Sequence, residues 1–186
     1  MAIGLAVGVQ SLALLAPEAS RVFRIFLKLP DSRGPAMHRS SRAYEPGQQC
    51  EQRDVVILQS MPGLGRIILA VLLAEVWQPL RRRDYHALRS LSGVAPVTRR
   101  SGKTSVVVRR YACNKRLANA LYHWARLATQ HDALSRRRYA ALRQRGHSHG
   151  RALRTVADRL LSVACTLLEQ QTLFDPTYEV REAAGA

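Results

Sequence analysis

The sequence is poor in acidic residues. Its 186 residues include 13 Asp and Glu against 29 Lys and Arg, which gives a formal net charge of +16. Such an excess of positive charge points to a polyanionic partner, and nucleic acid is the first candidate. A protein that binds anionic membrane surfaces is the competing class. The charge alone does not distinguish between these two partners.

Cysteine is also scarce. Cys50, Cys113 and Cys165 lie far apart, and no Cys-x-x-Cys or Cys/His spacing typical of a zinc site occurs. An odd number of separated thiols indicates reduced cysteines in a cytosolic protein. The close pair His147 and His149 has no further metal ligands nearby, so phosphate contact or simple solvation is the favoured interpretation of this loop.

A hydrophobic run long enough for a membrane span is missing at the amino terminus. The apolar stretch 2–16 has fifteen residues, fewer than the ~20 needed to cross a bilayer. No cation precedes it, as a secretory signal would require. The mixture of Pro, Gly, Ser and Arg that follows indicates a poorly ordered leader over 1–50, with a weak helix over 18–29. We therefore expect no membrane partner and a cytoplasmic, nucleoid-associated protein.

The positive charge is concentrated in two blocks. Residues 81–116 carry eleven cations and one anion, and residues 136–159 carry eight cations and one anion. Most of these cations are arginine, whose planar guanidinium group suits phosphate oxygens. Since compensating acids are nearly missing from both blocks, an ordinary solvated face of mixed charge fits them less well than a polyanion-binding surface.

Apolar periodicity predicts a mainly α-helical domain from residue 51 onward. Asp84 and Asn114 are predicted to cap helices, and Gly93 to end one. The exception is 97–111, where β-branched residues indicate one short strand or extended arm. The predicted helices cover 51–60, 66–77, 85–92, 115–130, 134–145 and 150–170.

The segment 51–77 has the pattern of a helix-hairpin-helix motif, in which two helices flank the turn Met61-Pro62-Gly63-Leu64-Gly65. Glycines let the backbone bend tightly and approach a ligand closely. The first N–H groups of the second helix then face a phosphate oxygen. Such a contact recognises the DNA backbone and not the base sequence. An ordinary turn between helices is the alternative. The predicted phosphate contacts are Pro62, Gly63, Gly65 and Arg66.

The segment 99–104 (RRSGKT) is chemically the most suggestive. It ends like a nucleotide-binding Walker A loop, but Val97 stands where that motif requires glycine, so nucleotide binding is not favoured. A second interpretation makes Ser101 a nucleophile toward a DNA phosphodiester, with flanking cations stabilising the developing charge. No general base is visible nearby, so the residues by themselves favour a phosphate-contact loop. The predicted contacts here and downstream are Arg99, Arg100, Gly102, Lys103, Arg109, Arg110, Lys115 and Arg116.

Four sequence blocks resemble the carboxy-terminal domain of the bridge-RNA-guided insertion-sequence transposases, a family that includes the pilin-segment invertase. In chain order they read LQSMPGLGRIILAVLLAEV, DYHALRSLSGVAPVTRRSGKT, ACNKRLANALYHWAR and RRRYAALRQRGHSHGRALRTVADRLL. The resemblance covers about 51–178. It implies a helix-hairpin-helix domain, DNA transposition and recombination, and a serine that becomes covalently linked to DNA. By motif position that serine is Ser101. DNA, a guide RNA and a second copy of the chain are the partners it suggests.

The amino-terminal part departs from this family pattern. Family members carry a ribonuclease-H-like domain with four metal-binding acidic residues, whereas 1–50 contain only Glu18, Asp31 and Glu45, in no matching context. We therefore expect a truncated copy with a leader (1–50), the transposase domain (51–178) and a tail (179–186). Such a chain binds DNA or RNA without catalysing strand exchange alone. No residue is predicted to bind metal, and Mg²⁺ is expected only with the missing domain. The alternative function is a non-catalytic nucleic-acid-binding module.

Overall fold

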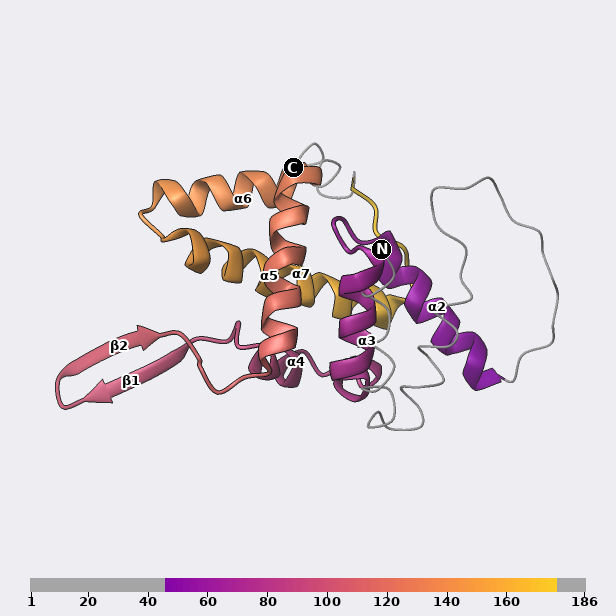
Figure 1. Ribbon diagram of the computed structural model, residues 1–186, viewed down its shortest axis with the longest axis horizontal. Coiled ribbons are helices and arrows are strands. Elements are labelled where there is room, and N and C mark those ends of the chain that lie inside the picture. Colours follow the sequence, from indigo (N-terminus) through magenta and orange to yellow (C-terminus); the bar gives the residue numbers. More distant parts are fainter. Residues whose placement is uncertain (1–45, 177–186) are drawn as a thin grey trace, which may run out of the picture.

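The computed structural model describes residues 46–176, which form a helical body and one two-stranded β-ribbon (Figure 1). This confirms the mainly α fold class with a short β segment. The predicted leader helix over 18–29 and the tail 179–186 lie outside the described residues. The elements are α2 (Pro46–Ser60), α3 (Arg66–Arg81), α4 (Tyr85–Leu91), β1 (Val97–Ser101), β2 (Thr104–Val108), α5 (Lys115–His131), α6 (Ala133–Gln144) and α7 (His149–Gln170).

Helix α5 lies at the centre of the packing and contacts α3, α6 and α7. Its apolar residues recur every three or four positions, so one face enters the core. Trp124 is fully buried there, and its indole Nε1 donates a hydrogen bond to the carbonyl oxygen of Pro62 at 3.0 Å. The turn between α2 and α3 is thereby fixed against the middle of the molecule.

Helix α7 runs along the body and buries the apolar stripe from Leu153 to Leu168 that the helical periodicity of 150–170 predicts. Leu167 is the exception, since it is only partly buried. The stripe lies under α4, α5 and α6, so this helix joins both basic blocks to one core. The buried members of the predicted stripe are Leu153, Val156, Ala157, Leu160, Leu161, Ala164 and Leu168.

The predicted helix caps are confirmed. The side chain of Asp84 accepts from the N–H of Ala87 at 2.9 Å, and that of Asn114 accepts from the N–H of Leu117 at 3.1 Å. Gly93, with φ of +73°, follows the end of α4. The apolar spacing over 85–92 also predicts that Leu91 lies on one side of the helix with Tyr85 and Leu88, but Leu91 is 43% exposed whereas Leu88 is buried.

Helix α3 extends further than the predicted end near residue 77. It continues to Arg81 across a kink at Val76, where the backbone has φ of −137° and ψ of 28°. Pro79 lies just beyond, and proline lacks the N–H group that a regular helix would pair at that position. No helix within 46–176, α3 included, combines the length and apolar character needed to span a membrane.

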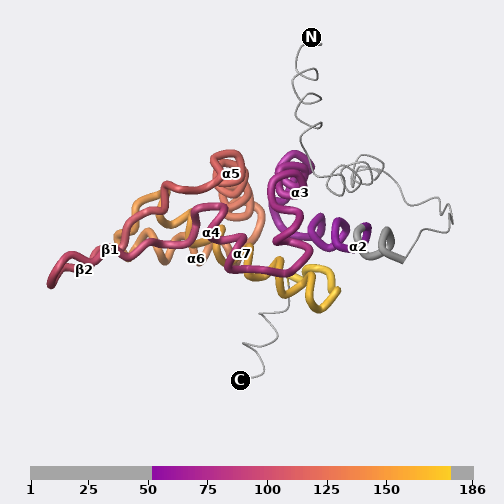
Figure 2. The backbone as a smooth tube through the Cα atoms, turned by 90° about the horizontal axis from the view of Figure 1, so that it is seen from below, coloured from indigo at the N-terminus to yellow at the C-terminus, as the bar shows by residue number. Residues whose placement is uncertain are grey.

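The β-ribbon projects beyond the helices in two perpendicular views (Figures 1 and 2). Strands β1 and β2 pair antiparallel, with Ser101 opposite Thr104 beside the turn. Gly102 has φ of +56° and is the first central residue of this two-residue turn, a position that favours glycine when φ is positive. The extended segment predicted over 97–111 is therefore a protruding hairpin, and most of its side chains face solvent.

Candidate nucleic-acid interface

The turn between α2 and α3 packs closely against α5. Gly63 has φ of +73°, and a Cβ at this residue would lie 2.5 Å from the backbone nitrogen of Ala128. The carbonyl oxygen of Pro62 accepts from Trp124. The close backbone approach predicted for a ligand at Gly63 is thus made by the protein's own helix.

Gly65 differs from Gly63 in its surroundings. Its backbone is extended, with φ of −72° and ψ of 164°, and a Cβ there would meet no atom within 4 Å. Gly65 is the N-cap of α3, so the next N–H groups have no acceptor inside the helix and carry its positive partial charge. The side chain of Ile67 beside them is 82% exposed. Of the two glycines, Gly65 lies where a phosphate could reach the backbone.

A groove between α3 and α5, called here the α3–α5 groove, has a volume of about 680 Å³. It extends along α5 from Leu127, near the turn, to Arg116, near the start of the helix. Arg116 is 72% exposed in its side chain and lies 3.6 Å from the carboxylate of Glu75. The lining residues are Gly65, Arg66, Ile67, Ile68, Val71, Arg116, Asn119, Ala120, His123 and Leu127.

The β-ribbon presents its predicted phosphate contacts to solvent. Arg99, Arg100 and Lys103 are all exposed, and neighbouring residues of a strand point to opposite faces of the ribbon. The ribbon contains no acidic residue, and between Asp84 and Asp158 the only acid in the sequence is Asp132. Its cations therefore have no acidic neighbour along the chain to neutralise them.

Ser101 lies at the last position of β1, beside the turn, with its side chain exposed. Within residues 46–176 its hydroxyl has no hydrogen-bond partner, and no histidine or carboxylate adjoins it along the ribbon. The structure thus places Ser101 next to Arg100 and Lys103, as the sequence does, but gives it no general base in the described part.

A second hollow, called here the ribbon-base pocket, lies where the ribbon joins the body and has a volume of about 270 Å³. It combines Arg109 and Arg110, which follow β2, with Arg151 and Arg154 from α7. The sequence prediction named the first two arginines and missed the other two, since they are distant in the chain. The only signal for them was the second basic block, 136–159.

Among the described residues, Asp158 is the single carboxylate that lines this pocket, and it is already paired. Asp158 accepts from Arg89 at 2.6 Å and from the hydroxyl of Tyr85 at 2.9 Å. Partial burial, followed by the hydrogen bond to Asp158, raises the pKa of Tyr85 above its ordinary value. Asp158 is thus bound to Arg89 and Tyr85, and its carboxylate forms no ion pair with the other arginines that line the pocket.

Two further predicted or suspected site residues have structural partners. Lys115 Nζ donates to the carbonyl oxygen of Tyr111 at 3.1 Å and lies over its ring, so it fixes the segment between β2 and α5. The ring of His149 lies between the hydroxyls of Tyr139, at 2.7 Å, and Tyr122, at 3.3 Å.

Burial raises the pKa of Cys165 to about 11, so this thiol is protonated at neutral pH.

Comparison with known proteins shows which family this sequence matches. Residues 55–140 match the family model described as the transposase IS116/IS110/IS902 family. The chain is 38% identical over 126 residues to the mini-circle putative transposase for IS117 of Streptomyces coelicolor, a match covering 67% of this chain and 30% of that protein. It is 34% identical over 129 residues to the IS116 uncharacterized 44.8 kDa protein of Streptomyces clavuligerus, covering 69% and 32%.

A third relative, the IS110 uncharacterized 43.6 kDa protein of Streptomyces coelicolor, is 34% identical over 131 residues, covering 69% of this chain and 31% of that protein. The chain spans about a third of the length of the curated relatives it matches. The transposase resemblance predicted from the four sequence blocks is confirmed. The chain belongs to the transposase IS116/IS110/IS902 family.

Proposed function

We propose that this chain binds the DNA backbone in the transposition of an insertion element, with the β-ribbon as its main contact. The observation that carries this proposal is the ribbon itself, which projects from the body (Figure 1). Its Arg99, Arg100 and Lys103 are exposed, and it contains no acidic residue. A narrow basic ribbon is a shape that enters a DNA groove or follows its phosphates. The names of the relatives support DNA as the polyanion.

The start of α3 supplies a second proposed contact. In the helix-hairpin-helix interpretation, the N–H groups after Gly65 bind one phosphate and Arg66 assists them. From this proposed contact at the start of α3, the α3–α5 groove extends to Arg116. A guide RNA has the same phosphate backbone and could use the same contacts. DNA is the partner that the family favours.

Removing the two ribbon arginines tests the proposal. The variant Arg99→Gln/Arg100→Gln is expected to weaken binding to a duplex by about tenfold or more, because hydrogen bonds to charged groups are strong. The slope of log affinity against log salt should fall by about 0.9 for each phosphate contact removed. Fluorescence anisotropy with a labelled duplex over a series of salt concentrations measures both quantities.

The matched control is Arg137→Gln/Arg138→Gln on α6, which removes the same charge from another adjacent, exposed arginine pair. We expect a smaller loss of affinity from this control. Equal losses from both variants would show that net charge alone drives binding, and an unchanged affinity of the ribbon variant would exclude the ribbon as the main contact.

We further propose Ser101 as the residue that becomes linked to DNA in the family reaction. Its support is its match to the family serine position and its place between cations at the exposed end of β1. Within the described residues no three His, Cys, Asp or Glu side chains gather that could hold the Mg²⁺ that the family resemblance implies. Without a base beside Ser101, this chain is expected to bind DNA and form no adduct alone.

Incubation of the chain with Mg²⁺ and element-end DNA, with and without guide RNA, tests this expectation. Denaturing gel electrophoresis of labelled DNA should show no covalent protein–DNA species. An adduct that disappears with Ser101→Ala would contradict the expected inactivity and establish the serine as nucleophile. An adduct that survives Ser101→Ala would exclude Ser101 from that role.

A further inference from the structure

The ribbon-base pocket contains more positive charge than any group on its walls compensates. Arg109, Arg110, Arg151 and Arg154 all line it, and none of the four has an ion pair in the described part of the chain. The only acid on its walls, Asp158, is held by Arg89 and Tyr85. Charges of one sign are thus gathered around a partly open hollow.

Two polar atoms in the walls of this pocket are buried and have no hydrogen-bond partner among residues 46–176. They are Nε of Arg110 and Nδ1 of His147. A buried N–H group without an acceptor is unfavourable, and such groups are rare in folded proteins. The guanidinium Nε–H is always a donor, so the pocket lacks an acceptor at the point where Arg110 needs one.

The charges in the pocket also act on one another. Partial burial, and next the nearby charge of Arg109, lowers the pKa of Arg154 below its ordinary value. An anion bound between these two guanidinium groups would offset the repulsion between their charges. The remaining wall is apolar, formed partly by Val94, Pro96 and Val107, and a low-dielectric wall strengthens charge–charge attraction.

We propose that the ribbon-base pocket binds one phosphate of a DNA backbone, held by the guanidinium groups of Arg109, Arg110 and Arg154. His147 and Arg151 lie at the same pocket and complete its donor set. A tetrahedral oxyanion accepts hydrogen bonds from several directions, which matches arginines that converge from the segment after β2 and from α7. This inference rests on the proposed function that the chain binds DNA.

The position of the pocket gives this phosphate a specific role. Arg109 and Arg110 directly follow β2, so a phosphate bound there would join the base of the ribbon to α7 through the ligand. Bound DNA would then fix the direction in which the exposed end of the ribbon points. The ribbon supplies affinity along its length, and the pocket fixes its base.

Inorganic phosphate is the first probe. Isothermal titration of the full chain with phosphate, at ionic strength held constant with chloride, should show binding, and ¹⁵N spectra should show the Arg110 Nε–H resonance shifting as the pocket fills. Arg154→Gln should weaken phosphate binding by about tenfold. The ribbon variant Arg99→Gln/Arg100→Gln, outside the pocket, should leave it unchanged. No phosphate binding, or equal binding by Arg154→Gln, would overturn the proposal.

A duplex is the second probe, and it separates this inference from the proposed function. Arg154→Gln should weaken duplex binding and lower the salt slope by about 0.9. If only the ribbon variant weakens duplex binding, the proposed function holds and the phosphate assignment fails. If neither variant weakens it, both fail. Two further variants distinguish loss of binding from loss of folding. Arg151→Gln changes an exposed residue of the same pocket, and Arg154→Lys keeps the positive charge at its position.

Discussion

Replacing Gly63 with alanine is expected to lower the free energy of unfolding by about 3 kcal/mol or more. The new Cβ would lie 2.5 Å from the backbone nitrogen of Ala128 and 2.9 Å from the carbonyl carbon of Leu127. Backbone atoms inside a helix cannot move aside as a flexible side chain would. The φ of +73° at Gly63 adds strain, because an L-residue in this region costs about 1–2 kcal/mol.

Gly65→Ala is the matched control for this prediction. A Cβ at Gly65 meets no atom within 4 Å, and its φ of −72° is ordinary for alanine. Alanine is a poorer N-cap than glycine, so we expect a loss of about 0.5–1 kcal/mol at most. Guanidinium unfolding followed by circular dichroism measures both variants, and equal effects would contradict the packing explanation.

The pair of glycine variants also bears on the proposed phosphate contact. If Gly63 supports the fold and Gly65 adjoins the ligand, Gly65→Ala should keep the fold and weaken DNA binding, because the Cβ stands beside the open N–H groups of α3. Anisotropy with the duplex measures this effect. An unchanged affinity in a folded Gly65→Ala variant would remove the start of α3 from the interface.

Local pattern predicted the elements of this fold well. The caps Asp84 and Asn114, the apolar stripe of α7 and the β-branched run of the ribbon all depend on residues close together in sequence. The misjudged details depend on tertiary contacts. Helix α3 continues past its kink at Val76 because Leu80 is buried in the core, which periodicity around residue 77 does not reveal.

The candidate site was harder to predict than the elements. The sequence named Arg109 and Arg110 from a basic block, but Arg151 and Arg154 join them only because α7 packs under the ribbon base. The packing of Gly63 against α5 is likewise absent from the sequence pattern, because Ala128 is far away in the chain and comes close only in the fold. Charge density can be read from a sequence, whereas convergence of charges from distant segments requires the packing.

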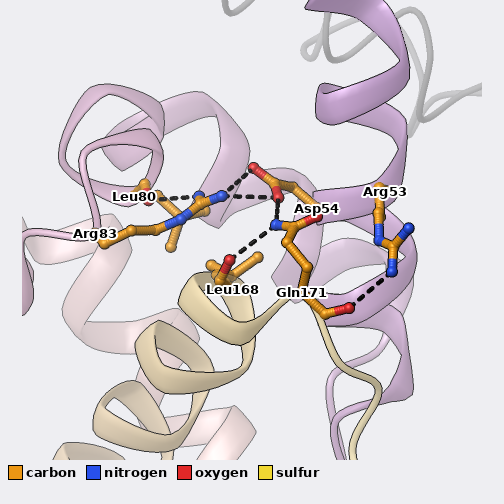
Figure 3. A network of polar contacts seen from close by, with 6 residues as sticks. All are labelled: Arg53, Asp54, Leu80, Arg83, Leu168 and Gln171. Atoms are coloured by element: carbon orange, nitrogen blue, oxygen red, sulfur yellow. Dashed lines mark hydrogen bonds and ion pairs between the residues drawn. The ribbon is translucent and has the colours of Figure 1, made fainter.

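A buried polar network joins α2 to the ends of α3 and α7 (Figure 3). The carboxylate of Asp54, which is 3% exposed in its side chain, accepts from Nη2 of Arg83 with both oxygens at 2.9 Å. It also accepts from Nε2 of Gln171 at 2.9 Å. Arg83 donates further to the carbonyl oxygen of Leu80, and Gln171 to that of Leu168.

Both partners of Asp54 stand at backbone positions that need support. Arg83 has φ of 57° and Gln171 has φ of 54°, which are left-handed values uncommon for residues other than glycine. Each residue follows the end of its helix, so the hydrogen bonds to Asp54 hold two chain reversals in place. The carbonyl oxygen of Gln171 also accepts from Arg53 at 2.9 Å, which adds a second tie between α2 and the end of α7.

Asp54→Ala is therefore expected to lower the free energy of unfolding by about 3–5 kcal/mol, the range for removing one partner of a buried ion pair. The loss arises because Arg83, which is 17% exposed, keeps its charge without an acceptor, and Gln171 loses one of its own. Guanidinium unfolding of the full chain measures the change. The control Arg116→Ala removes an arginine from the exposed 3.6 Å contact with Glu75 and should change stability by less than about 1 kcal/mol.

The double variant Asp54→Leu/Arg83→Met separates the ion pair from the space it fills. Replacing both charges with apolar side chains leaves no buried charge unpaired, so it should recover much of the stability that Asp54→Ala loses. If the double variant is as unstable as Asp54→Ala, the hydrogen bonds to Gln171 and Leu80 carry the effect instead of the unpaired charge. If Asp54→Ala changes stability no more than Arg116→Ala, the network does not hold α2 to the body.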